Sequence, residues 1–431
     1  MRRILLRGGV VLNPQTHLHE PLDVLVEGER IVALGNALSP VDAQVLEVSG
    51  CYVVPGLVDM HVHLRDPGFP DKETMATGTR AAAAGGLTTV VCMPNTRPTV
   101  DDVSILDGVL ATARRDGVVR VHSTAALTKG LAGVERTDMA NLLQHGAVAF
   151  TDDGKSVMDP VVLYDIFQTA AQLDTLIASH CEDHHLVRGG AMHRGEVSQL
   201  LQDEGIPALG EELVIARDLL FAADTGARLH IQHVSTARGV QLIREAKARG
   251  VRVTAEATPH HFSLTDAILL DQGALAKVNP PLRPAEDVVA VVAGLQDGTL
   301  DVIATDHAPH TLAEKQQGLS RAPFGFVGLE TSVGLAFTHL VHTGKLSADQ
   351  VVARMSVAPA RVLGLPIPQI AVGEVADITV IDPEFIWTVD PNRFLSKAQH
   401  SPFTGTKLRG KAVATVVGGR VVYTEKEGLL T

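Results

Sequence analysis

Residues 57–64 read LVDMHVHL and residues 300–307 read LDVIATDH, and both are short apolar runs that carry histidine or aspartate near their ends. Six further apolar runs of similar length lie between them, at 87–93, 119–127, 147–153, 175–183, 228–235 and 251–257. Segments of helical periodicity separate the runs, for example 73–84 and 236–249, each followed by a glycine. Eight alternating strand and helix units predict a (β/α)8 barrel.

Short runs of β type fill both ends of the chain. They lie at 3–12, 22–34 and 43–54, and again at 373–382, 385–390 and 411–424. Glycine, aspartate and proline bound these runs, which is typical of short strands joined by turns. We expect the two ends to combine into one small β-sandwich-like domain, residues 1–55 with 366–431, beside a barrel of residues 56–365.

The composition excludes several classes of protein. The 431 residues carry a formal net charge of -12 and no run of lysine or arginine, so we expect no nucleic-acid partner. Cys51, Cys92 and Cys181 have no paired spacing and indicate free thiols in a reducing compartment. The sequence shows neither a signal peptide nor an apolar run of the ~20 residues that span a bilayer, so we expect a cytoplasmic protein without membrane contact.

Polar side chains stand at or just past the ends of the predicted strands. They are His61, His63, Asn95, Asp152, Asp153, His180, His233 and Asp306. In a barrel these strand ends converge on one face, where active sites are built. Four histidines and two aspartates exceed the ligands of one zinc ion, but they suit two ions ~3.5–4 Å apart. We therefore expect two Zn2+ ions per subunit and a bridging hydroxide that forms near neutral pH.

His61 and His63 form the expected chelating pair, because strand alternation points residues two apart to the same side. The pair at 17–19 has the same spacing, and we interpret it as a solvated turn of the small domain. Asp306 ends the last predicted strand, where its carboxylate can take a proton from the hydroxide and pass it to a leaving amide nitrogen. We expect Asp306 to be the general acid and base; a helix cap or turn is the alternative.

The fourth strand leaves the identity of its ligand open. The apolar pattern of residues 147–153 does not fix the strand register, so either Asp152 or Asp153 can face the metals. Lys155 is a third alternative, as a carrier of a bridging carbamate, although it follows the strand end and a glycine.

Two long motifs carry a resemblance to a known family. DMHVHLRDPG at 59–68 and ATDHAPHTLAEK at 304–315 resemble the signature stretches of the dihydroorotases, within the amidohydrolase superfamily. Similar matches are CMPNT at 92–96, FTDDGK at 150–155, SHCED at 179–183, QHVST at 232–236 and KVNPPLR at 277–283. The short form FTDDG resembles the type I bacterial enzymes, which lack the strand-end lysine of many relatives.

The resemblance implies a role for each matching residue. His61, His63 and Asp306 would bind the first ion, His180 and His233 the second, and Asp153 would bridge them. Substrate contacts would come from His63, Arg65, Asn95, Asn279, His310 and the backbone of Phe324 and Gly325. Arg65 follows His63 by two residues, which would keep it on the same face of the strand and let it pair bidentately with a carboxylate. A helix cap or a surface position is the alternative for Arg65.

The resemblance also implies the reaction. A dihydroorotase interconverts N-carbamoyl-L-aspartate and L-dihydroorotate in pyrimidine synthesis. One alternative is another cyclic amidase of the superfamily, such as a hydantoinase or an allantoinase. A different class is an inactive scaffold for aspartate transcarbamoylase, although such proteins typically lose metal ligands. A homodimer and an association with aspartate transcarbamoylase are further expectations.

Overall fold

A closed sheet of parallel strands forms the centre of the molecule. The computed structural model describes residues 3–430. Its eight barrel strands pair in chain order: β8 (Leu57–Val62), β9 (Leu87–Cys92), β10 (Arg120–Ala125), β11 (Ala147–Phe150), β12 (Leu176–Ser179), β13 (Arg228–Ile231), β14 (Val253–Ala257) and β15 (Val302–Ile303). The sheet closes where Val62 bridges His307 in parallel and the His63 N–H donates to the His307 carbonyl at 2.8 Å. The predicted (β/α)8 barrel is confirmed.

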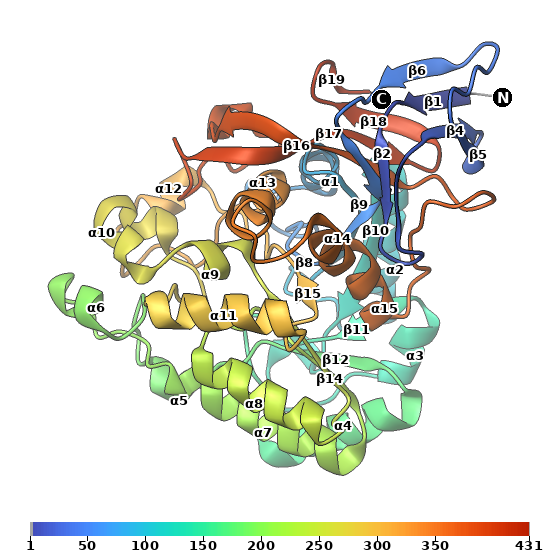
Figure 1. Cartoon of the computed structure of the whole chain (residues 1–431). Coiled ribbons are helices and arrows are strands. Elements are labelled where there is room, and N and C mark those ends of the chain that lie inside the picture. The colour runs from blue at the N-terminus through green and yellow to red at the C-terminus, as the bar shows by residue number, and fades with distance from the viewer. Residues whose placement is uncertain (1–2, 431) are drawn as a thin grey trace.

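Helices surround the barrel (Figure 1). The longer ones are α1 (Met75–Ala84), α2 (Val103–Asp116), α4 (Pro160–Leu173), α7 (Leu209–Thr225), α8 (Ala237–Ala248) and α11 (Ala285–Asp297). Shorter ones are α3 (Met139–Gln144), α5 (His184–Val187), α6 (Glu196–Leu200), α9 (Pro259–Ser263), α10 (Leu269–Gln272), α12 (Leu312–Lys315), α13 (Ser332–Ala336), α14 (Ala348–Val352) and α15 (Ala358–Leu363). The helices expected at 73–84 and 236–249 are α1 and α8, and the N-caps Thr74 and Thr236 start them by accepting backbone N–H groups.

The two chain ends share one small β-domain, as expected. In Figure 1 the blue N-terminal strands and the red C-terminal strands lie side by side. A four-stranded sheet contains β5 (Arg30–Gly35), β4 (Asp23–Glu27), β1 (Arg3–Arg7) and β6 (Gln44–Glu47). A seven-stranded sheet contains β19 (Gly428–Leu429), β18 (Arg420–Thr424), β17 (Lys407–Val417), β16 (Ile378–Thr388), β7 (Tyr52–Pro55), β2 (Val10–Asn13) and β3 (Leu18–Pro21). Residues of both sheets, including Ile4, Val24, Val53 and Val380, bury a common core.

The barrel strands are shorter than the apolar runs that predict them. The run at 300–307 contributes only Val302 and Ile303 to β15, and β8 ends at Val62. Beyond the ends of β8, β13 and β15, Arg65, His233 and Asp306 have positive φ angles of 58°, 32° and 49°. Such backbone is unfavourable for residues other than glycine and clusters at functional sites.

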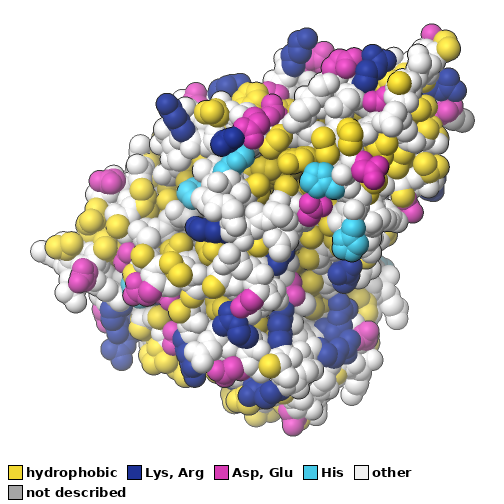
Figure 2. All heavy atoms as spheres, viewed as in Figure 1, with side chains coloured by type: hydrophobic (Ala, Val, Ile, Leu, Met, Phe, Trp, Pro, Cys, Tyr) yellow, Lys and Arg dark blue, Asp and Glu magenta, His cyan; other side chains and the backbone are white. Residues whose placement is uncertain are grey.

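The surface carries both signs of charge. Figure 2 shows basic and acidic side chains interspersed over the viewed face, so that face has no extended field of one sign. Within residues 3–430, no helix has the length and apolar character that crossing a bilayer requires.

Candidate metal and substrate site

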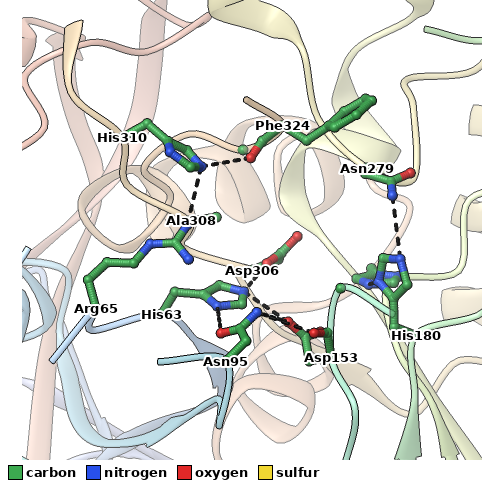
Figure 3. A pocket seen from close by; sticks show the side chains of 13 residues that line it. His63, Arg65, Asn95, Asp153, His180, Asn279, Asp306, Ala308, His310 and Phe324 are labelled. Atoms are coloured by element: carbon green, nitrogen blue, oxygen red, sulfur yellow. Dashed lines mark hydrogen bonds and ion pairs between the residues drawn. The ribbon is translucent and has the colours of Figure 1, made fainter. Parts of the chain in front are cut away.

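The carboxyl ends of the barrel strands enclose a cavity of about 240 Å³. Its lining contains His63, Arg65, Asn95, Asp153, Gly154, His180, His233, Asn279, Asp306, Ala308, His310, Phe324 and Gly325. Figure 3 shows Arg65 and His310 on one side of this pocket and Asn279 with His180 on the other. Every predicted site residue except His61 lines the cavity, and His61 lies beneath it, against Asp153 and Asp306.

Acceptors hold both histidines of the His61–His63 pair at Nδ1. His61 Nδ1 lies 2.6 Å from Glu256 Oε1, and His63 Nδ1 lies 2.9 Å from Asn95 Oδ1. These oxygens can only accept, so each Nδ1 carries a hydrogen, and in the neutral form that binds a metal each ring has its lone pair on Nε2. Both Nε2 atoms face Asp306 Oδ1, at 3.4 Å and 3.1 Å respectively. His61 and His63 therefore present two nitrogen ligands to the same position, beside Asp306.

The structure separates the two aspartates that follow β11. Asp153 points into the cavity, with Oδ1 3.2 Å from His61 Nε2 and Oδ2 3.4 Å from His63 Nε2. Asp152 turns away and accepts the backbone N–H groups of Leu127 and Thr128 at 2.8 Å and 3.0 Å. Lys155 is exposed and belongs to none of the ligand clusters among the described residues. Asp153 is therefore the group that the fourth strand offers to a metal.

His180 and His233 form a second buried pair. His180 Nδ1 lies 2.8 Å from His233 Nε2, and the rings meet edge to face. His233 Nδ1 is buried with no hydrogen-bond partner in the described structure. Burial and the neighbouring His180 and His61 lower the pKa of His233 to about 3, so its ring is neutral. Neutral imidazole is the form that binds metals.

The donor atoms fit divalent metal ions. Three overlapping groups of residues each have their own ligand atoms within 4.8 Å of one another. They are His61–His233–Asp306, His61–His63–Asp153 and Asp153–His180–His233. Although burial opposes protonation of His61, the carboxylates of Glu256, Asp306 and Asp153 raise its pKa well above the ordinary value. The site thus favours positive charge, and its imidazole and carboxylate donors are those of protein zinc sites.

Arg65 and His310 create a place for an anion. Burial lowers the pKa of Arg65 to about 10, and its Nε donates to the Pro309 carbonyl at 3.1 Å. Lys72 Nζ lies 3.3 Å from His310 Nδ1 and can only donate, so His310 carries its hydrogen on Nε2, 2.9 Å from the Phe324 carbonyl. Arg65 Nη2 lies 3.3 Å from the same Nε2. Two donors that close together suit a shared acceptor such as a carboxylate oxygen.

The reason given for Arg65 from strand alternation is wrong. Because β8 ends at Val62 and Arg65 adopts a left-handed conformation, a turn rather than the pleat of a strand brings the guanidinium to the cavity.

Asn279 lies across the cavity from Arg65. Its amide donates to Glu182 and lies 3.4 Å from His180 Nε2. His261 supports this segment from beneath, because its Nε2 donates to the Pro280 carbonyl at 2.9 Å. His184 contacts Glu182 at 3.3 Å at the rim. None of His184, His185, His260 and His261 is among the described residues that line the cavity.

A buried lysine fixes the loop that ends the cavity. Lys315 Nζ donates to the carbonyls of Lys277, Pro323 and Gly325 at 3.0, 3.0 and 2.9 Å. Gly325 has a φ of 115°, and a Cβ there would lie 2.7 Å from the Ala308 side chain. The backbone of Phe324 and Gly325 can therefore approach a ligand closely while the loop stays in place.

Sequence reasoning missed Glu256, His230, Glu182 and Lys72. Glu256 is the one acidic residue of the run VRVTAEA at 251–257, and a buried carboxylate in a barrel strand needs donors. That rule could have singled it out. Glu182 and Lys72 lie in loops, where no periodicity indicates their direction.

Comparison with known proteins agrees with this architecture. A family model described as Dihydro-orotase-like matches residues 50–239. The dihydroorotase of Pelotomaculum thermopropionicum is 51% identical over 424 residues, covering 98% of this chain and 99% of that protein. The dihydroorotase of a Geobacillus species is 46% identical, covering 97% and 98%. The structure of L-hydantoinase (dihydropyrimidinase) from Arthrobacter aurescens superposes with a TM-score of 0.90 at 27% identity, covering 100% of this chain and 98% of that one.

A (β/α)8 barrel that gathers four histidines and two aspartates at the carboxyl ends of its strands has the architecture of the amidohydrolases. Within that class, the chain belongs to the dihydroorotase family. The resemblance of its motifs to that family is confirmed.

Replacing Lys315 by Met should loosen the loop at 323–325, because the carbonyls of Lys277, Pro323 and Gly325 lose the Nζ donor that they share. The Lys277 carbonyl keeps the Gly325 N–H as a donor at 2.9 Å, and a buried carbonyl that is left unpaired costs about 1–3 kcal/mol. We expect a lower melting temperature and faster hydrogen–deuterium exchange in residues 321–328. Lys155→Met, at an exposed lysine beside the cavity, should change neither quantity. Equal effects from both variants would refute the role of Lys315 as a clamp that holds the three carbonyls together.

Proposed function

We propose that this protein is a zinc-dependent dihydroorotase that interconverts L-dihydroorotate and N-carbamoyl-L-aspartate. One observation carries the proposal: the paired donors of Arg65 and His310 share a cavity with the cluster of histidines and aspartates. The substrate combines a ring amide, which must be hydrolysed, with a carboxylate, which must be held. Family membership over nearly the full chain supports the same reaction.

Two zinc ions would divide the ligands between them. His61, His63 and Asp306 would hold the first, His180 and His233 the second, and Asp153 would lie between them. When bound, such ions supply a water molecule that loses its proton near neutral pH, together with a Lewis acid for the amide carbonyl.

Asp306 moves the proton. Its pKa lies below the ordinary value, since His61 and His63 outweigh the effect of burial, and the carboxylate is therefore available as a base. It accepts the proton of the attacking water and delivers it to the amide nitrogen as the carbon–nitrogen bond breaks. Ring opening then releases one proton from the new carboxylic acid, and ring closure consumes one.

The remaining side chains orient the substrate. Arg65 and His310 bind the α-carboxylate. Asn95 adds a side-chain N–H. Its amide nitrogen makes two contacts with Asp153, at 3.0 Å to Oδ2 and at 3.3 Å to the carbonyl, and the second is the weaker. Asn279 faces the ring from the side opposite Arg65, and the backbone of Phe324 and Gly325 lines the cavity beside His310. His63 contributes both a metal ligand and part of the wall.

The anion-binding pair favours dihydroorotate over the substrates of hydantoinases and allantoinases. Those enzymes share the barrel and the hydrolysis of a cyclic amide, but hydantoin and allantoin carry no carboxylate on the ring. An inactive scaffold is disfavoured because all six proposed ligands converge in the structure.

The deciding experiment is ring opening of L-dihydroorotate by purified, zinc-supplied protein, followed by ultraviolet absorbance. We expect turnover that a chelator abolishes and that added zinc restores. Hydantoin and allantoin should react far more slowly. Preference for either of these compounds, or no turnover with zinc bound, would refute the proposed substrate.

Asp306→Asn should lower kcat by ~10²- to 10⁴-fold, because general acid and base catalysis is lost. Zinc content is measured in parallel, since Asp306 is also a proposed ligand. Near-normal turnover by the zinc-loaded variant would contradict the proton-transfer role.

Arg65→Gln should lower kcat/KM for dihydroorotate by roughly 10- to 150-fold, the worth of one hydrogen bond to a charged group. Dihydrouracil has the same ring without the carboxylate and serves as the control substrate. Its slower hydrolysis should be unaffected by the substitution. An equal loss for both substrates would show that Arg65 supports the fold of the site instead of the carboxylate.

A further inference from the structure

Glu256 occupies a position that the reaction does not explain. It lies in β14, and its side chain is fully buried. A carboxylate in such surroundings costs several kcal/mol unless donors surround it. Three donors meet it: His61 Nδ1 at 2.6 Å, His230 Nε2 at 3.0 Å and the backbone N–H of His233 at 3.1 Å. Two of these donors belong to proposed metal ligands.

The contact with His61 determines which nitrogen faces the metals. Because Glu256 Oε1 accepts from Nδ1, the lone pair of neutral His61 is on Nε2, which points toward Asp153 and Asp306. The alternative tautomer would place a hydrogen where a metal must bind. A carboxylate behind a ligating imidazole also raises the basicity of the ring and fixes its orientation.

The contact with His233 holds a strained backbone. His233 has a φ of 32°, which costs of order 1 kcal/mol or more for a residue with a side chain. Its N–H donates to Glu256 Oε1, the same oxygen that accepts from His61. That hydrogen bond stabilises the turn which directs the His233 ring toward His180, 2.8 Å away.

His230 fixes the other oxygen of the carboxylate. Its Nε2 donates to Oε2, and its Nδ1 accepts from the hydroxyl of Thr254 at 2.9 Å. Thr254 and Glu256 stand two residues apart on β14, so both point to the same side of the strand. The carboxylate cannot rotate without breaking this arrangement.

We propose that Glu256 is a positioning residue that prepares both metal positions at once, through the tautomer of His61 and the backbone of His233. The inference deepens the proposed function and rests on its two-metal site. Glu256 itself touches neither substrate nor reacting atoms. Its effect is therefore on metal affinity at each position, and on turnover only through the metals.

The test measures zinc affinity by equilibrium competition with a chelator, starting from metal-free protein. We expect Glu256→Ala to weaken zinc binding at both positions by about 10- to 100-fold. Glu256→Gln keeps an amide oxygen that can accept from His61 and His233, so its loss should be smaller. Cobalt(II) replaces zinc in a second measurement, in which a changed absorption spectrum of Glu256→Gln reports an altered His61 ligand.

Glu211→Gln is the matched control. Glu211 is also a buried carboxylate with several donors, accepting from the Ser235 N–H at 2.8 Å and from Arg283 at 3.0 Å, but it touches no proposed metal ligand. Its substitution should lower the melting temperature and leave zinc affinity within about twofold.

Unchanged zinc affinity in both Glu256 variants would overturn the inference, and so would weakening at only one metal position. If Glu256→Ala does not fold, Glu256→Gln decides, because it preserves the size of the buried side chain. Failure of the proposed function would give a different result, because zinc would bind to the unaltered protein without opening dihydroorotate. The zinc affinities of the Glu256 variants would still show whether Glu256 positions the ligands.

Discussion

Closure of the barrel is the constraint on which the site depends. The bond from the His63 N–H to the His307 carbonyl joins the first barrel strand to the residues after the last one. It brings Asp306 within 3.1 Å of His63, across more than half of the chain. The proposed base and the proposed metal ligands come from the ends of several strands, so all their distances except that within the His61–His63 pair are set only when the sheet closes. Folding of the barrel is therefore what brings the histidine and aspartate side chains together.

Gathering these groups has an electrostatic cost, and the local structure offsets it. The acidic side chains at the strand ends are buried, and each faces an imidazole or a backbone donor. The positive φ angles of Arg65, His233 and Asp306 store strain at the same place. Well-packed surroundings, such as the core around Phe150 and Ile231, hold residues in these conformations. The packing of the scaffold thus maintains conformations that these residues would not adopt by themselves.

The sequence predicts the proposed metal ligands that stand at strand ends, because both the strand period and their position at the strand ends indicate them. His61, His63, His180, His233 and Asp306 all follow this rule. This rule could not choose between Asp152 and Asp153. The strand β11 ends at Phe150, before both residues, and Asp152 turns away because it accepts the backbone N–H of Thr128. Asn279, His310, Phe324 and Gly325 lie in loops, where only family resemblance indicates a role. For Glu256 the sequence offers one signal, a lone acidic residue in a barrel strand, but its partners on neighbouring strands are set by the closed sheet. The homodimer and the association with aspartate transcarbamoylase stay predictions.

The clamp at Lys315 has a consequence for exchanging parts between barrels. One ammonium group ties the carbonyl of Lys277 to those of Pro323 and Gly325, while the lysine itself belongs to the helix after Asp306. Three segments that look independent along the chain are therefore one mechanical unit. A transplant of a single loop from a relative with another substrate would separate an ammonium from its carbonyls. Substrate range in this scaffold should change by the joint replacement of residues 277–283, 304–315 and 321–326, as a module.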